Sequence, residues 1–352
     1  MKARGFIKKA TFVPAILFFW AFSAFADTLA VSLYPLPTLK GFPTAIVSDT
    51  SGRIWFVESA GNKLAVITAL STHIREYDIP TARSEPVDLV MDADGMFWLV
   101  ELDANQIARF DPQKNGFEEF EIPTAKSQPY RVAVDKVGRV WFTEFAANKL
   151  GMFDSRTKRF KEYPIPSNMS QPSAIDVSPA GIVWLVESYA NKIAGFDPKT
   201  QGFKEYNIPQ EFAIPGDIAF DAKGRLWFAA RKDRMLVSFD PATAEFKEFN
   251  LKEKIVPEGI VIDPSGNVWY CDYIGGKIGR FNPDTGQLTE IALPEAGLKP
   301  YAIALDPLGK VWFTEVAQHK IGVVDTAAIA GKGKKFSVEL GSAEMKVLNE
   351  KK

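Results

Sequence analysis

The chain has 352 residues, of which 46% are hydrophobic and 24% charged, and this composition excludes a disordered or fibrous protein. The 42 basic and 43 acidic residues give a net charge of −1, so the charge does not favour nucleic-acid binding. Cys271 is the single cysteine, which excludes an internal disulfide and leaves packing to stabilise the fold.

The first 26 residues predict a secretory signal peptide. "MKARGFIKKA" carries four basic residues and no acid, an apolar stretch follows, and Ala24–Ala26 offers small residues at a cleavage position. The alternative, a membrane anchor, needs roughly 20 consecutive apolar residues, and this stretch is shorter. We therefore expect export to the periplasm or the medium without stable membrane insertion. The mature chain would carry 38 basic and 43 acidic residues, a net charge of −5.

From residue 43 onward the sequence repeats itself. "PYRVAVDKVGRVWFTE" (Pro129–Glu144) and "PYAIALDPLGKVWFTE" (Pro300–Glu315) are almost the same, and five more copies are in register with them. Each copy opens on a proline, at Pro43, Pro86, Pro129, Pro172, Pro215, Pro257 and Pro300. Each then has a tryptophan, at Trp55, Trp98, Trp141, Trp184, Trp227, Trp269 and Trp312. The step is 43 residues, except for one of 42, which is typical of propeller blades.

Each copy predicts four short strands. In the third copy these are Tyr130–Asp135, Arg139–Glu144, Lys149–Asp154 and Arg159–Pro166, separated by turns and rich in β-branched and aromatic residues. Four antiparallel strands in each of seven copies predict an all-β fold, a seven-bladed β-propeller of four-stranded antiparallel blades.

The last copy loses its pattern after Asp325 and lacks a well-spaced fourth strand. The segment "AVSLYPLP" before the first repeat matches the fourth strands of other copies, with the same six-residue step from Pro37 to Pro43. We therefore expect the N-terminal strand, within Leu29–Pro37, to complete the seventh blade and close the ring. The competing closure uses Lys334–Leu340. Residues 27–340 would form a single domain, and residues 341–352 a solvated tail.

The strand directions place the residue after each proline and the end of the second strand on one face, which we call the upper face. The slot after the proline varies in size and charge: Thr44, Val87, Tyr130, Ser173, Gly216, Glu258 and Tyr301. The next slot holds Ala or Gly in four blades but Asp88, Arg131 and Asp217 in the others. Propellers commonly bind ligands at such a channel mouth.

Six of the seven second strands end in an acid: Glu58, Glu101, Glu144, Glu187, Asp272 and Glu315. A ring of carboxylates suggests metal binding. However, a lysine usually follows five residues later, and blade 5 loses both members at Ala230 and Met235. This correlation favours ion pairs across the hairpin. Blades 5 to 7 also depart from the repeat with Arg231, Tyr273 and His319.

The pattern "VWFTE-x-x-x-NKIG-x-FDP", followed by "EY-x-IP", resembles the streptogramin B (virginiamycin B) lyase family over about residues 28–325. The resemblance implies opening of a cyclic depsipeptide by elimination, with Mg²⁺ and a histidine base. The motif has His after the prolines of the last two blades, a Glu before the second of these prolines, and Tyr after the first proline. Here those positions hold Glu258, Tyr301, Lys299 and Thr44, so the catalytic residues do not carry over.

Three functions remain open. The first is a monomeric binding protein for a small molecule, glycan or peptide; its candidate contacts are Tyr130, Arg131, Asp217, Arg231, Glu258, Tyr301 and Asp88. The second is an enzyme, either a lyase with a rearranged site or a metal-dependent hydrolase. Its catalytic candidates are Glu258, Tyr301 and Glu315, and its metal candidates are Glu258, Asp217 and Glu315; Mg²⁺ or Ca²⁺ is implied by the resemblance. The third is a protein-interaction scaffold.

Overall fold

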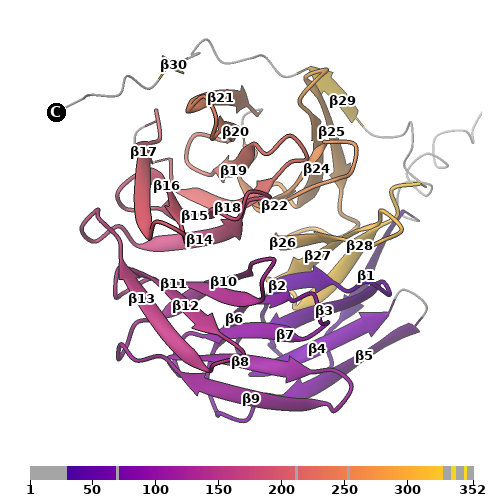
Figure 1. Cartoon of the computed structure of the whole chain (residues 1–352). Helices are drawn as coiled ribbons and strands as arrows, with labels where there is room; N and C mark the ends of the chain where they lie inside the picture. Colours follow the sequence, from indigo (N-terminus) through magenta and orange to yellow (C-terminus); the bar gives the residue numbers. More distant parts are fainter. Residues whose placement is uncertain are drawn as a thin grey trace, which may run out of the picture.

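The computed structural model describes residues 30–68, 71–210, 213–251, 254–327, 334–337 and 345–346. The predicted signal peptide lies outside the described residues. Seven antiparallel sheets form the blades of a ring, and this confirms the predicted seven-bladed propeller (Figure 1). We number the strands of a blade from the channel outward, so the first strand is innermost.

The first three blades each contain four strands. Blade 1 comprises β2 (Pro43–Ser48), β3 (Arg53–Glu58), β4 (Lys63–Thr68) and β5 (Ser71–Asp78). Blade 2 comprises β6 (Pro86–Met91), β7 (Phe97–Glu101), β8 (Gln106–Asp111) and β9 (Gly116–Glu121). Blade 3 comprises β10 (Pro129–Val134), β11 (Arg139–Glu144), β12 (Lys149–Asp154) and β13 (Arg159–Pro164).

Blades 4 to 6 follow the same order, and two of them gain a further strand. Blade 4 comprises β14 (Pro172–Val177), β15 (Val183–Glu187), β16 (Lys192–Asp197) and β17 (Gly202–Asn207). Blade 5 comprises β18 (Pro215–Phe220), β19 (Leu226–Ala230), β20 (Met235–Asp240), β21 (Glu245–Asn250) and β30 (Met345–Lys346). Blade 6 comprises β22 (Pro257–Ile262), β23 (Val268–Asp272), β24 (Lys277–Asn282), β25 (Gln287–Ala292) and β29 (Lys334–Ser337).

Blade 7 joins the two ends of the chain. It comprises β26 (Pro300–Leu305), β27 (Val311–Glu315), β28 (Lys320–Val324) and β1 (Val31–Pro35). β1 pairs antiparallel with β28, from Val31↔Val324 to Pro35↔Lys320, which confirms closure by the N-terminal strand. The competing closure is wrong, because β29 instead pairs with β25 on the outer edge of blade 6 (Figure 1).

A pair of hydrogen bonds between blades 7 and 1 supports this closure. Directly after β1, the backbone amide and the hydroxyl of Thr38 donate to the carboxylate of Glu76, at 2.9 and 2.8 Å. The same pair of hydrogen bonds joins Thr81 to Glu119 and Thr124 to Glu162 at the next junctions. The N-terminal strand therefore makes the contact that blades elsewhere in the ring make with their neighbours.

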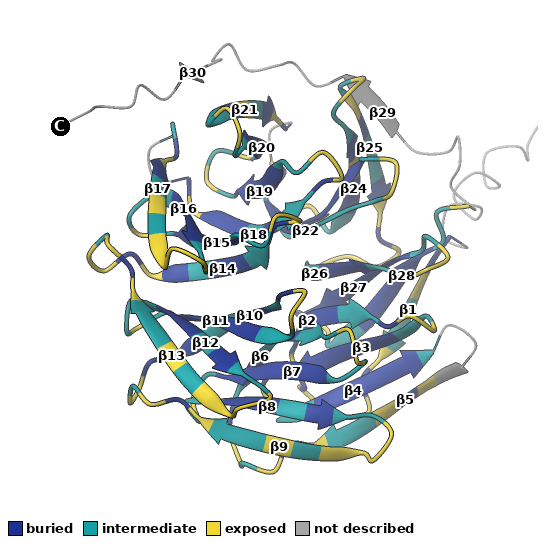
Figure 2. Ribbon diagram, in the orientation of Figure 1, coloured by how far each residue is buried: buried dark blue, intermediate teal, exposed yellow. Residues whose placement is uncertain are grey.

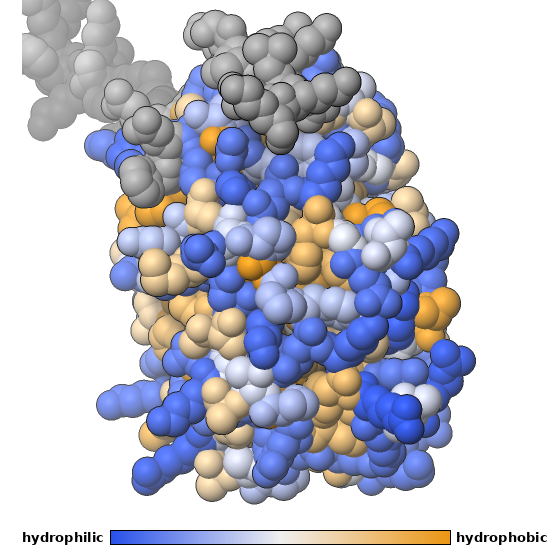
Figure 3. Space-filling model, turned by 60° about the vertical axis from the view of Figure 1, so that its left-hand side comes forward, coloured by the Kyte–Doolittle hydropathy of each residue, from blue (hydrophilic) through white to orange (hydrophobic). Residues whose placement is uncertain are grey.

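The core lies between the blades. The second strands are buried along nearly their whole length, whereas the fourth strands alternate exposed and covered residues (Figure 2). In six blades an aspartate in the turn after the first strand accepts a hydrogen bond from the tryptophan Nε1, as Asp135 does from Trp141 at 2.9 Å. Hydrophilic residues dominate the side of the molecule in Figure 3, with apolar groups between them.

Candidate functional site

The candidate site lies where the first strands begin, at the upper mouth of the channel. Each opening proline pairs with the last residue of the second strand, as in Pro129↔Glu144 and Pro300↔Glu315. A register shift follows the proline in each blade, at the first slot in blades 1, 2 and 4 and across both slots in blades 3, 5, 6 and 7. The strand ends therefore meet on one face, as expected.

Arg131 of β10 is the centre of the cluster. Its guanidinium lies 4.6 Å from the ring centroid of Tyr130, and its Nη1 donates one long contact of 3.4 Å to the Tyr130 carbonyl. It forms no ion pair with a described carboxylate. It is surrounded by protein yet remains partly accessible. Several of its hydrogen-bond donors are therefore available to a ligand.

Aspartates from other blades surround Arg131. Asp88 of β6 accepts a hydrogen bond from the Val132 amide at 2.9 Å, across the junction of blades 2 and 3. Asp217 of β18 accepts one from the Ile218 amide at 3.0 Å. Burial raises the pKa of Asp88 to about 6, although the charge of Arg131 opposes this shift. Burial also raises the pKa of Asp217, again opposed by Arg131.

An ion pair connects blades 5 and 6 beside this group. Nε of Arg231, one residue past the end of β19, lies 2.5 Å from Oε2 of Glu258 on β22. Burial raises the pKa of Glu258, while the charges of Arg231 and Arg131 lower it. Gly216 makes this approach possible, because a Cβ there would lie 3.2 Å from the Arg231 Nε.

Tyr301 of β26 completes the group from blade 7. Its ring lies edge-on to Tyr273, with centroids 6.4 Å apart, and the Lys299 ammonium lies 5.2 Å from the Tyr273 centroid. Burial raises the pKa of Tyr301, and the charge of Arg131 opposes that shift. The fields of Tyr130, Glu258 and Arg231 also act on Tyr301, so the seven ligand-contact candidates gather in one region.

Asp176 of β14 belongs to this region and was missed by the sequence reasoning. Burial raises its pKa to about 7, and the nearby charge of Asp217 adds to the shift. The signal was present in the repeat, since the fourth residue after the proline is apolar in every other blade. Those residues are Val47, Val90, Ala133, Ala219, Val261 and Ala304.

Glu315 does not join the cluster. It is fully buried at the end of β27, and its two oxygens accept hydrogen bonds from the amides of Lys299, Ala317 and Gln318 at 2.7, 2.9 and 2.6 Å. Its carboxylate therefore fixes the loops of blade 7 and faces neither Glu258 nor Tyr301 as a catalytic partner.

The candidate metal ligands do not fit a divalent cation. Glu258 is paired with Arg231, Asp217 lies in the field of Arg131, and Glu315 is held by backbone amides. Within the described residues no three His, Cys, Asp or Glu side chains are grouped closely enough to hold a metal ion.

The carboxylates at the ends of the second strands are buried, but their expected ion pairs with the lysines are wrong. Glu144 and Lys149 are cross-strand partners, yet Lys149 Nζ lies 3.1 Å from Glu162 on the fourth strand. The same choice recurs for Lys192 with Glu205 and Lys277 with Glu290, both at 2.8 Å. The lysines pair with the fourth-strand acids and not with the second-strand acids, because the fourth-strand acids lie nearer the surface, where ionisation costs less.

His319 also has a structural explanation. It has a φ of 56°, in the left-handed region, and the equivalent Asn62, Asn105, Asn148 and Asn191 have φ of 55–57°. Asparagine tolerates this conformation well, and the Asn62 amide also binds the connector through Ile79, Thr81 and Ser84. His319 therefore occupies a turn position and does not reach the Arg131 cluster.

The fold places the protein in the class of seven-bladed β-propellers. A model of the virginiamycin B lyase family matches residues 25–195 and 155–345, so the chain belongs to this family. No curated protein sequence matches the chain. Within the described residues, no helix is long and apolar enough to cross a membrane.

Solved structures show the same fold. A streptogramin B lyase is 24% identical over 90% of this chain and 99% of its own, with a TM-score of 0.78. A catalytically inactive histidine-to-alanine variant of virginiamycin B lyase from Staphylococcus aureus, with quinupristin, is also 24% identical with a TM-score of 0.78, over 83% and 98% of the two chains. Kuenenia stuttgartiensis hydrazine synthase is 12% identical over 83% and 98%, with a TM-score of 0.70.

Proposed function

We propose that the protein is an exported binding propeller whose upper channel mouth takes a small molecule, glycan or peptide. The observation that carries this proposal is the Arg131 guanidinium, which is enclosed by protein, partly accessible, and free of an ion pair with any described carboxylate. Buried arginines are usually paired. One that lines a channel with available donors is suited to a ligand's carbonyl or hydroxyl oxygens.

The neighbouring side chains would set the orientation of this ligand. Tyr301 and Tyr273 offer aromatic faces at the mouth, and the Glu258–Arg231 pair offers one acceptor and several donors. The nearby charges of Asp88 and Asp217 limit the attraction of Arg131 for anions. A polar, uncharged or zwitterionic group therefore suits the site better than a simple anion.

A panel of short peptides, oligosaccharides and cyclic depsipeptides, screened by thermal shift, tests this proposal. A compound at 100 times its Kd stabilises the folded state by about 2.7 kcal/mol. We expect the Tyr301→Ala and Glu258→Gln variants to lose the shift while their ligand-free melting temperatures change little. If both variants melt much earlier and keep the shift, the cluster is structural and the proposal fails.

The enzyme alternative rests on Glu258 and Tyr301, which occupy the slots of the catalytic histidines in the resemblance. Glu258 is held by Arg231, and burial raises the pKa of Tyr301 further from neutral pH. We therefore expect no Mg²⁺-dependent opening of quinupristin in a chromatographic assay. Turnover at about 1–1000 s⁻¹, the range of dedicated enzymes, would establish the lyase instead.

Export is the second part of the proposal. It is supported by the charge and hydropathy pattern of residues 1–26. N-terminal sequencing of the protein recovered from the periplasm or the medium should begin near Asp27. Recovery of the uncleaved chain in the cytoplasm would refute export and leave the binding site untouched.

A further inference from the structure

Aromatic rings fill the junctions between most blades. In blades 1 to 5 the tryptophan contacts an aromatic ring on the fourth strand of its own blade and a phenylalanine on the third strand of the next. Trp141, for example, lies 6.2 Å from Tyr163 and 5.6 Å from Phe196 between ring centroids. The same arrangement surrounds Trp55, Trp98, Trp184 and Trp227. In blade 7, Trp312 lies 6.2 Å from Tyr34.

The junction of blades 6 and 7 departs from this pattern. Ile291 stands in the fourth-strand slot that is Tyr or Phe in every other blade, as shown by its pairing with Ile278. Val324 stands where blades 2 to 6 have Phe, and it pairs with Val31, another aliphatic residue. Among the described residues Trp269 alone of the blade tryptophans contacts no aromatic ring; its neighbour is Arg280.

A cavity of about 1050 Å³ lies at this junction and extends along the lower ends of the first strands of blades 6, 7 and 1. It is lined by Trp269, Ile291 and Ile303 and reaches the turns at Asp263 and Asp306, so it opens on the lower face. It is therefore separate from the Arg131 cluster, which lies at the other end of the channel. An under-packed junction costs stability, and stability is commonly given up where a site is needed.

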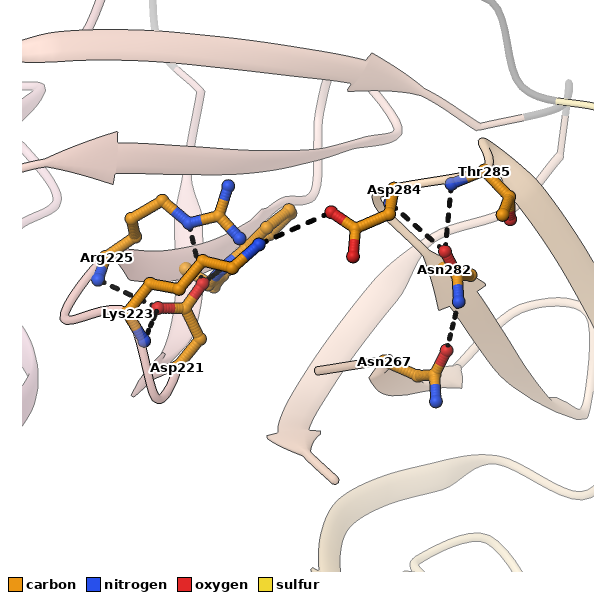
Figure 4. Close-up of polar contacts among 8 residues, drawn as sticks. Asp221, Lys223, Arg225, Asn267, Asn282, Asp284 and Thr285 are labelled. Carbon is orange, nitrogen blue, oxygen red and sulfur yellow. Dashed lines mark hydrogen bonds and ion pairs between the residues drawn. The ribbon is translucent and has the colours of Figure 1, made fainter. Parts of the chain in front are cut away.

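Arg280 lies at the edge of this cavity, and it differs from the turn arginines of other blades. In blades 1, 3 and 5 an arginine beside the turn binds the turn aspartate at 2.6–2.7 Å, as Arg225 binds Asp221 (Figure 4). Blade 6 has Asn267 there, and its amide donates to Asp263 at 3.0 and 2.8 Å. Asn267 also accepts from Asn282 at 2.9 Å (Figure 4).

Arg280 comes instead from the third strand and does not bind Asp263 closely. Its Nε lies 3.8 Å from the Asp263 carboxylate, its guanidinium is 5.5 Å from the Trp269 centroid, and its side chain is 45% exposed. Because Asn267 already satisfies Asp263, most donors of Arg280 remain available at the cavity edge.

We propose that this lower-face cavity binds a small aromatic carboxylate or sulfonate. The ring of the ligand would lie against Trp269 and Ile291, in the volume that a tyrosine or phenylalanine fills at the other junctions. Its anionic group would reach Arg280, whose planar fork suits a two-oxygen acceptor. Gln287 and Thr289 line the same cavity and add polar contacts.

The test uses 1-anilinonaphthalene-8-sulfonate, an aromatic sulfonate that fluoresces in apolar surroundings, titrated into the full mature chain. We expect saturable binding that weakens at least tenfold in Ile291→Tyr, which restores the ring of the other blades, and in Arg280→Gln. Ile291→Tyr should also raise the melting temperature. Val324→Phe is a second filling variant if Ile291→Tyr folds poorly.

Arg109→Gln is the matched control. Arg109 occupies the equivalent third-strand position of blade 2 and lies 5.9 Å from the Trp98 centroid, but Phe120 and Phe153 fill that junction. Its substitution should leave dye binding unchanged. Equal losses in Arg109→Gln and Arg280→Gln, or full binding in both filling variants, would overturn the proposal. Binding only after removal of residues 328–352 would also overturn it, since the chain's own C-terminal segment would then be the occupant.

Discussion

Single buried side chains decide much of the stability of this ring, and Trp141 is a clear example. It is fully buried, donates to Asp135 at 2.9 Å, and packs between Tyr163 and Phe196. Trp141→Ala should cost about 3–5 kcal/mol of unfolding free energy, the usual loss for a large aromatic in a core. Urea unfolding measures this cost, with the exposed Val137→Ala as control. A loss near that of the control would place Trp141 outside the core.

The buried glutamates at the ends of the second strands give stability a pH dependence. Burial raises the pKa of Glu144 to about 7; the nearby charge of Glu162 adds to this shift and the charge of Lys149 opposes it. The unfolded chain releases this proton near pH 4.3, so the folded state binds more protons between about pH 4.3 and 7. Stability should therefore fall as the pH rises through that window.

Glu144→Gln removes this titration. The variant should lose up to about 1.4 kcal/mol per pH unit of the slope and be relatively more stable at pH 8 than at pH 5. Unfolding curves at several pH values measure the slope, with the exposed Glu121→Gln as control. Parallel curves for Glu144→Gln and the unsubstituted protein would show that Glu144 is ionised in the fold.

The burial of the tryptophans could be predicted from the sequence, but the ion pairs of the hairpin lysines could not. The tryptophans recur at a fixed spacing beside apolar residues, so their burial follows from the pattern. The partner of Lys149 was predicted wrongly, because Glu144 lies directly opposite it and Glu162 lies diagonally from it, two residues before its other register partner, Pro164. Choosing between them depends on burial, which spacing alone does not reveal.

At the scale of the element, β1 carries the closure of the ring. Val31 is buried at 5% exposure in the core between blades 6 and 7, whereas the next residue, Ser32, is exposed. Val31→Asp should destabilise the protein strongly, because it places a charge in an apolar junction, whereas Ser32→Asp should change little. Thermal unfolding compares the two variants, and equal melting temperatures would mean that β1 does not bind β28 in solution.

The β1 register was predictable because the distance from Pro37 to Pro43 repeats the step found between other blades. The outer strands β29 and β30 were not, because Lys334–Ser337 and Met345–Lys346 follow no repeat. They pair with exposed edges of blades 6 and 5. An open edge accepts many extended segments, so sequence alone does not indicate which blade is chosen.

At the scale of the whole molecule, the ring brings together residues that are distant in sequence. Asp88, Arg131, Asp217, Glu258 and Tyr301 come from five blades, and their meeting follows from the slots that they share in the repeat. The cavity beside Trp269 was not foreseen, because it depends on how Ile291 packs against the strands of the next blade. The repeat pattern describes one blade at a time, so it does not show which side chains of neighbouring blades meet.

The proposed binding function requires the Arg131 cluster to face a ligand. A crystal structure of the protein with the most stabilising compound of the thermal-shift panel tests it most directly. We expect density for that compound at the upper mouth, with a polar atom within hydrogen-bond distance of the Arg131 guanidinium and a face against Tyr301. The compound bound elsewhere, with only water between Arg131, Asp88 and Asp217, would contradict it.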